Sequence, residues 1–158
     1  MNKIVEAAAI LVISLIMPEA SAQSATIDHL TQGQLMEQAQ LLEQKAVESG
    51  LASAKLAEYP NHYTMIATRT RNGGAEVHLK EADVFIVLRG KATLITGGTV
   101  VDPQTVSPGE IRGSAVSGGT PLTLRRGDFV HIPANVPHQL LLKKNSEFVY
   151  FVIKVQGQ

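Results

Sequence analysis

Two patterns of hydrophobic positions follow each other along the chain, and the first is helical. The apolar residues that recur at steps of four, three and four, the period of an α-helix, are Leu35, Ala39, Leu42 and Ala46. Thr31 and Gln34 have the spacing of a capping box, and Gly50 is placed to end the helix. A lone helix with one apolar stripe must bury it, either on the main domain or on a partner subunit.

The second pattern begins at Tyr63, where short runs rich in Val, Ile, Leu and Thr alternate with Gly, Pro and Asn turns. The runs are YTMIATR, AEVHL, DVFIVLRG, KATLITGG, TPLTLRRGD, FVHIP, HQLLLKK and EFVYFVIKV. Many short strands without helical interludes predict an all-β protein, either an antiparallel sandwich or a barrel. Residues 97–121 are rich in Gly and Pro, and we expect them to form a long loop with one short hairpin.

The first residues have the layout of a secretory signal peptide. Lys3 precedes an apolar run over residues 7–17, Pro18 ends the run, and Ala20-Ser21-Ala22 supplies small residues for cleavage before Gln23. The run is shorter than the roughly 20 residues that span a bilayer, so an uncleaved anchor helix is the less favoured alternative. We therefore expect a periplasmic or secreted protein with no stable membrane anchor after cleavage.

Length and composition narrow the organisation and the partners. A chain of 158 residues suits one domain, and we expect a signal peptide over 1–22, an N-terminal helical segment over 23–62 and a β-barrel domain over 63–158. Fourteen basic residues balance fourteen acidic ones, so charge gives no reason to expect a nucleic-acid partner. The absence of cysteine excludes disulfides, thiolate metal ligands and Cys nucleophiles.

Four possible metal donors lie in two stretches of the barrel region. If AEVHL is a strand, Glu76 and His78 face the same side of it, and Asp83 opens the next strand beside them. His138 follows Pro137, which restricts the backbone before it. Imidazole and carboxylate donors suit one divalent transition metal such as Fe, Mn, Zn or Ni.

The stretches GGAEVHLKEADVFIVLRG and GDFVHIPANVPH resemble the two sequence motifs of the cupin superfamily. On the first motif, His78 takes the second His of a His-x-His pair, Asp83 the Glu position and Gly90 the closing Gly. On the second, His138 takes the place of the last ligand. The resemblance covers roughly residues 63 to 155 and implies a single cupin-type jelly-roll β-barrel, here preceded by an α-helix. It also implies a homodimer, since similar proteins often pair through their sheets.

The chain departs from these motifs at four positions. The departures are Glu76 for the first His, Asp83 for Glu, Asn135 for Gly and Leu142 for Asn. Both acidic changes keep an oxygen donor, and two histidines with one carboxylate suffice for a facial triad. The alternative is a metal-free barrel with buried hydrogen bonds, but two acids in a low-dielectric cavity would then repel each other without a cation.

The resemblance implies two classes of function. The first is a metal-dependent enzyme, such as a dioxygenase, isomerase or lyase, that acts on a small organic molecule in the cavity, with Glu76 as a ligand or a general base. Arg112 and His131 are the candidates for contact with that substrate, and an ordinary surface arginine and a rim histidine are the alternatives. The second class is a non-catalytic cupin that binds a small ligand or a metal.

Overall fold

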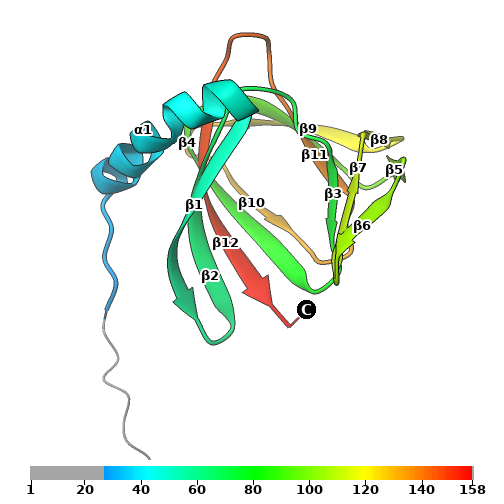
Figure 1. Ribbon diagram of the computed structural model, residues 1–158, viewed down its shortest axis with the longest axis horizontal. Coiled ribbons are helices and arrows are strands. Elements are labelled where there is room, and N and C mark those ends of the chain that lie inside the picture. The colour runs from blue at the N-terminus through cyan, green and yellow to red at the C-terminus, as the bar shows by residue number, and fades with distance from the viewer. Residues whose placement is uncertain (1–26, 158) are drawn as a thin grey trace, which may run out of the picture.

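The computed structural model describes residues 27–157, which form one helix and twelve strands (Figure 1). The elements are α1 (Gln32–Ser49), β1 (Leu51–Tyr59), β2 (His62–Arg69), β3 (Ala75–His78), β4 (Glu81–Thr96), β5 (Thr99–Val101), β6 (Gln104–Ser107), β7 (Glu110–Gly113), β8 (Ala115–Ser117), β9 (Thr120–Arg125), β10 (Phe129–Ile132), β11 (His138–Leu141) and β12 (Phe148–Gln156). The signal peptide expected over 1–22 lies outside the described residues. Within residues 27–157, no helix is long and apolar enough to cross a membrane.

The long strand β4 connects the two halves of the barrel. Its first half pairs with β10 and β12, and its second half pairs with β9 and β11, all antiparallel. Gly90 lies between the two halves with φ 87°, a conformation that glycine adopts without a steric penalty. The strand therefore belongs to two sheets, one with β10 and β12 and the other with β9 and β11. The two sheets are continuous through β4 and curl into an open barrel (Figure 1). The predicted all-β jelly-roll barrel preceded by an α-helix is confirmed.

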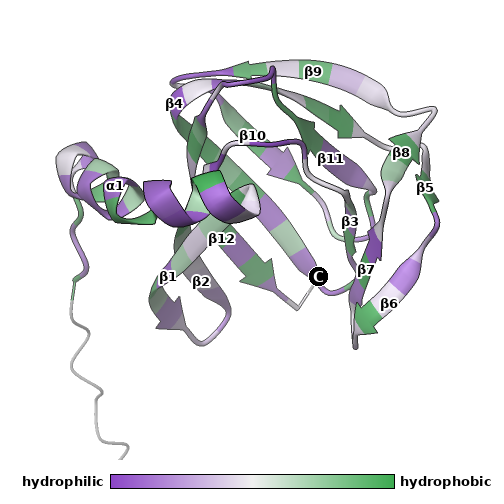
Figure 2. Ribbon diagram, turned by 45° about the horizontal axis from the view of Figure 1, so that its top comes forward, coloured by the Kyte–Doolittle hydropathy of each residue, from purple (hydrophilic) through white to green (hydrophobic). Residues whose placement is uncertain are grey.

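Side chains alternate between the two faces of the sheet that carries the helix. Phe148 and Tyr150 on β12 belong to the core cluster inside the barrel, whereas Val149 between them packs with Ala39 of α1 on the other face. In Figure 2, polar and hydrophobic residues alternate along several of the other strands. The helix therefore buries its apolar stripe on its own domain, and the stripe is no evidence for a partner subunit.

Both predicted ends of the helix are confirmed. The N–H of Gln34 donates to the Thr31 side chain, and the Gln34 side chain accepts from the Thr31 N–H, which together form the capping box. Gly50 ends the helix with φ 88°, and its N–H donates to the carbonyl of Ala46.

Two stretches differ from the expected elements. Strand β1 lies inside the segment 23–62 that we expected to be helical, and it pairs with β2 along its length, so the sheet begins at Leu51 rather than at Tyr63. Its sequence LASAKLAEY is rich in residues with low strand propensity, and pairing with a neighbour overrides that preference. Residues 97–121 hold the four short strands β5–β8 rather than one hairpin, and β7 pairs with β3.

Candidate metal site and cavity

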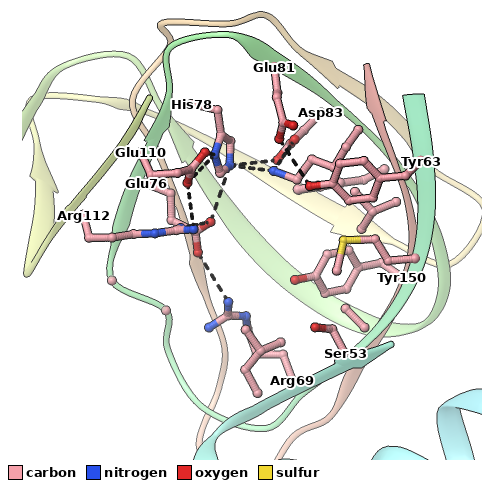
Figure 3. A pocket seen from close by; sticks show the side chains of 18 of the residues that line it. Ser53, Tyr63, Arg69, Glu76, His78, Glu81, Asp83, Glu110, Arg112 and Tyr150 are labelled. Atoms are coloured by element: carbon pink, nitrogen blue, oxygen red, sulfur yellow. Dashed lines mark hydrogen bonds and ion pairs between the residues drawn. The ribbon is translucent and has the colours of Figure 1, made fainter. Parts of the chain in front are cut away.

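The open barrel contains a cavity of about 1210 Å³, into which charged side chains from β2, β3, β4, β7 and β12 project (Figure 3). The titratable residues among those that line it are Tyr63, Arg69, Arg71, Glu76, His78, Lys80, Glu81, Asp83, Glu110, Arg112, Tyr150 and Lys154. Most of the acidic side chains in the cavity lie around His78. Among the residues labelled in Figure 3, Arg69 lies on the side opposite His78.

Glu110 orients the imidazole ring of His78 through a hydrogen bond. Strand β3 pairs with β7 so that His78 lies opposite Glu110, which brings the two side chains together on one face. The Nδ1 atom of His78 lies 2.7 Å and 2.8 Å from the two carboxylate oxygens of Glu110, so Nδ1–H is the donor. The Nε2 atom faces Asp83 of β4 and accepts from the ammonium of Lys154.

His138 is oriented in the same way by a backbone carbonyl. Its Nδ1 atom lies 3.0 Å from the carbonyl oxygen of Val136, to which it donates. Its Nε2 atom is buried and has no hydrogen-bond partner among residues 27–157. Burial lowers the pKa of His138, so the ring is neutral near pH 7 and Nε2 is an unused acceptor.

Asp83 lies between the two imidazole rings. One carboxylate oxygen, Oδ2, is 3.4 Å from Nε2 of His78 and 3.6 Å from Nε2 of His138. Burial raises the pKa of Asp83, but the interaction with His78 and the positive charge of Lys154 outweigh it and hold the pKa below its usual value. Asp83 is therefore an ionised oxygen donor within reach of both rings.

Glu76 completes the group of possible ligands from the rim. One ligand atom each from Glu76, His78 and His138 lies within 4.8 Å of the others. Burial raises the pKa of Glu76, but the charge of Arg112 outweighs it, and the pKa is lowered. A carboxylate with a lowered pKa is a weak base, which favours Glu76 as a ligand over Glu76 as a general base.

Lys154 is the residue of the site that sequence reasoning missed. Its Nζ atom lies 2.7 Å from Nε2 of His78 and 2.5 Å from Oδ1 of Asp83, and the side chain is almost fully buried. The ammonium donates to the imidazole and forms an ion pair with the carboxylate. Lys154 thus supplies the positive charge that the buried acids require. The alternation Tyr150, Val152, Lys154 on β12 was the available signal, since steps of two share a face.

The two expected substrate contacts have different outcomes. Arg112 lines the cavity and forms ion pairs with Glu76 and Glu110. His131 lies on β10 and is exposed, whereas Ile132 beside it belongs to the barrel core. Because neighbouring residues of a strand face opposite sides, His131 points away from the cavity, and its assignment as a substrate contact is corrected.

Comparisons with known proteins identify the fold. No family model matches the chain, and no curated protein matches it significantly. The solved structures similar to it include the cupin domain of Cnp3 from Schizosaccharomyces pombe, with 10% identity and a TM-score of 0.51. The match covers 67% of this chain and 64% of the Cnp3 chain, which is less than two thirds of the Cnp3 chain. KdgF from Halomonas sp. is 15% identical with a TM-score of 0.50, and 70% of this chain and 83% of that chain are covered.

A third similar structure is an uncharacterized conserved protein with a double-stranded beta-helix domain from Klebsiella pneumoniae. It is 14% identical to this chain, with a TM-score of 0.50 and coverage of 68% of this chain and 78% of that one. At these identities the likeness is one of fold.

Proposed function

We propose that this chain, a barrel with the cupin fold, is an exported metal-binding protein that acts on a small organic molecule in its cavity. The observation that carries the proposal is the pair of buried histidines, His78 and His138, whose Nε2 atoms face the same carboxylate of Asp83. The export part rests on the signal-peptide pattern of residues 1–22.

The orientation of the two rings supports a metal site. Histidines that bind metals almost always donate their other ring N–H to a carboxylate or a backbone carbonyl. His78 donates to Glu110 and His138 donates to the Val136 carbonyl, so both kinds of support are present. The Nε2 atom of His138 is buried and has no partner among residues 27–157. This fits a metal-binding histidine better than a structural one, because an unsatisfied buried acceptor is costly.

The residues that would hold the metal are His78, His138 and Glu76, with Asp83 as the fourth donor. A bound divalent transition metal would supply Lewis-acid chemistry, which fits an isomerase or a lyase, whereas a dioxygenase would need a redox-active metal such as Fe. Arg112 holds Glu76 in its carboxylate form, and Glu110 fixes the tautomer of His78. Lys154 donates to the atom of His78 that a metal would bind, so its ammonium must move away when the metal enters.

A non-catalytic, metal-free barrel is the second candidate, and Lys154 is the observation that favours it. The contacts of its ammonium with His78 and Asp83 already balance the charge of the buried acid. In that case the site would be a buried hydrogen-bond network and the cavity would bind a ligand without a metal.

Metal analysis of the wild-type protein and of Lys154→Met separates the two candidates. After purification without chelators or a His tag, we expect close to one equivalent of a transition metal per chain by elemental analysis. Lys154→Met should bind the metal at least about tenfold more tightly by calorimetric titration, since it leaves Asp83 as an unpaired buried charge that the metal can neutralise. Wild-type protein that holds no metal even after reconstitution would contradict the proposal.

Glu110→Gln tests the support of the metal site. In the variant, a neutral amide replaces the ionised carboxylate that accepts from Nδ1 of His78. The imidazole ring therefore loses its fixed tautomer and part of its basicity. We expect the metal dissociation constant to rise about 10- to 100-fold. Competition with a fluorescent chelator measures the change, and Glu58→Gln, at an exposed ion pair on β1, is the matched control. Equal affinity in the two variants would show that Glu110 does not support the site.

A further inference from the structure

We propose that the cavity recognises its ligand through a carboxylate group, which binds to the buried guanidinium of Arg69. This inference deepens the proposed function, because it names the chemical class of the small molecule that the same cavity would hold.

Arg69 is a buried cation, and at least one of its donors has no partner among the described residues. It ends β2, is 5% exposed and lines the cavity. Its Nε atom is buried without a hydrogen-bond partner in the described part of the chain. The acid that faces it is Glu76, with 3.7 Å between Nη2 of Arg69 and Oε1 of Glu76, and Glu76 is already bound to Arg112. A guanidinium has five N–H donors, so Arg69 retains donors for a ligand.

Arg69 faces open space, because it lines the cavity of about 1210 Å³. A Cβ at Gly73 would lie 2.7 Å from Nη1 of Arg69, so the glycine allows the guanidinium to keep its position. Tyr150 and Ser53 point toward the same part of the cavity (Figure 3). Burial raises the pKa of Tyr150, so its hydroxyl is neutral and can donate a second hydrogen bond to a carboxylate.

The charge of the cavity also favours an anion. Five basic side chains line it, namely Arg69, Arg71, Lys80, Arg112 and Lys154, against the four acids Glu76, Glu81, Asp83 and Glu110. A divalent metal would add two positive charges. A positive cavity with low-dielectric walls concentrates anionic ligands, and a carboxylate can bind a guanidinium through two parallel hydrogen bonds.

Glu76 relates the anion site to the metal donors. Its Oε1 lies 3.7 Å from Nη2 of Arg69, and its Oε2 lies 3.7 Å from Nε2 of His78. A ligand whose carboxylate binds Arg69 would therefore have Glu76 between that carboxylate and the imidazole ring of His78.

Binding of benzoate and of its neutral isostere benzamide tests the proposal on the wild-type protein. We expect benzoate to bind at least about tenfold more tightly by calorimetry or NMR titration, since hydrogen bonds between charged groups are stronger than those to a neutral amide. Equal affinities, or no saturable binding of either probe, would overturn the proposal. The titration is repeated after removal of metal with a chelator, because a carboxylate can also bind a metal. A preference that disappears with the metal would overturn the role of Arg69.

A pair of charge-matched variants locates the site. Arg69→Met is expected to lose the preference for benzoate, whereas Arg71→Met should keep it, because the Arg71 guanidinium is engaged by the carbonyls of Val47 and Glu48. Equal losses in both variants would overturn the assignment to Arg69. If Arg69→Met does not fold, the wild-type comparison still decides the proposal. Metal content measured on the same samples keeps failure of the metal site distinct from failure of the anion site.

Discussion

Replacing His78 or His138 with alanine is expected to weaken metal binding by more than about 100-fold. Loss of an outer-shell partner already costs 10- to 100-fold, and loss of a ligand costs more. Both histidines are buried with Nε2 directed at Asp83, and among residues 27–157 no other histidine belongs to this group of donors. Elemental analysis after dialysis against metal-free buffer measures the occupancy, and calorimetric titration measures the affinity.

His131→Ala is the control for these two variants. It removes the same side chain from an exposed position on β10, outside the cavity, and should leave metal content unchanged. Circular dichroism of each variant checks that the barrel is intact, because a buried histidine also contributes to packing. Full occupancy in both His78→Ala and His138→Ala would show that the ligands are assigned wrongly, even if the wild-type protein holds a metal.

Replacing Gly90 with alanine is expected to lower the free energy of unfolding by more than about 3 kcal/mol. Gly90 has φ 87°, which a side chain disfavours, and a Cβ there would run into the carbonyl oxygen of Glu147 on the neighbouring chain segment. That segment leads into β12, whose pairing with β4 includes Phe148 opposite Gly90. The clash therefore involves backbone, which cannot move without disturbing the sheet. Urea denaturation followed by circular dichroism measures the change.

Gly127→Ala separates the two causes of this loss. Gly127 has φ 89°, nearly the value at Gly90, but in the described structure a Cβ there meets no atom within 4 Å. We expect the backbone conformation alone to cost about 1–2 kcal/mol at Gly127. The difference between the variants then measures the contact with Glu147. A similar loss in both would show that this contact contributes nothing.

The fold was predictable because its signals are local. The capping box at Thr31, Gly50 at the helix end and the runs of β-branched residues each depend on neighbours in sequence. The failures have the opposite cause. Strand β1 has the composition of a helix and becomes a strand through its pairing with β2, and the short strands β5–β8 lie in a segment whose Gly and Pro content predicts a loop.

The site was predictable only in part for the same reason. The structure brings Glu76, His78, Asp83 and His138 together as expected, because three of them lie within one short stretch. The groups that determine their chemistry come from elsewhere. Glu110 reaches His78 through the pairing of β3 with β7, and Lys154 reaches it from the last strand. Sequence periodicity placed these residues on strands, but it could not supply the register between distant strands.

The sharing of β4 between both sheets has a consequence for the order of folding. Asp83 lies on its first half, and His138 lies on β11, which pairs with its second half. Strands β3 and β11 pair with each other and hold Glu76, His78 and His138, so Asp83 joins these three donors only when the first half of β4 is in place. Pairings between strands so distant in sequence also form slowly, because the loops between them must close first. Binding of a metal by all four donors would thus mark the end of barrel closure rather than begin it.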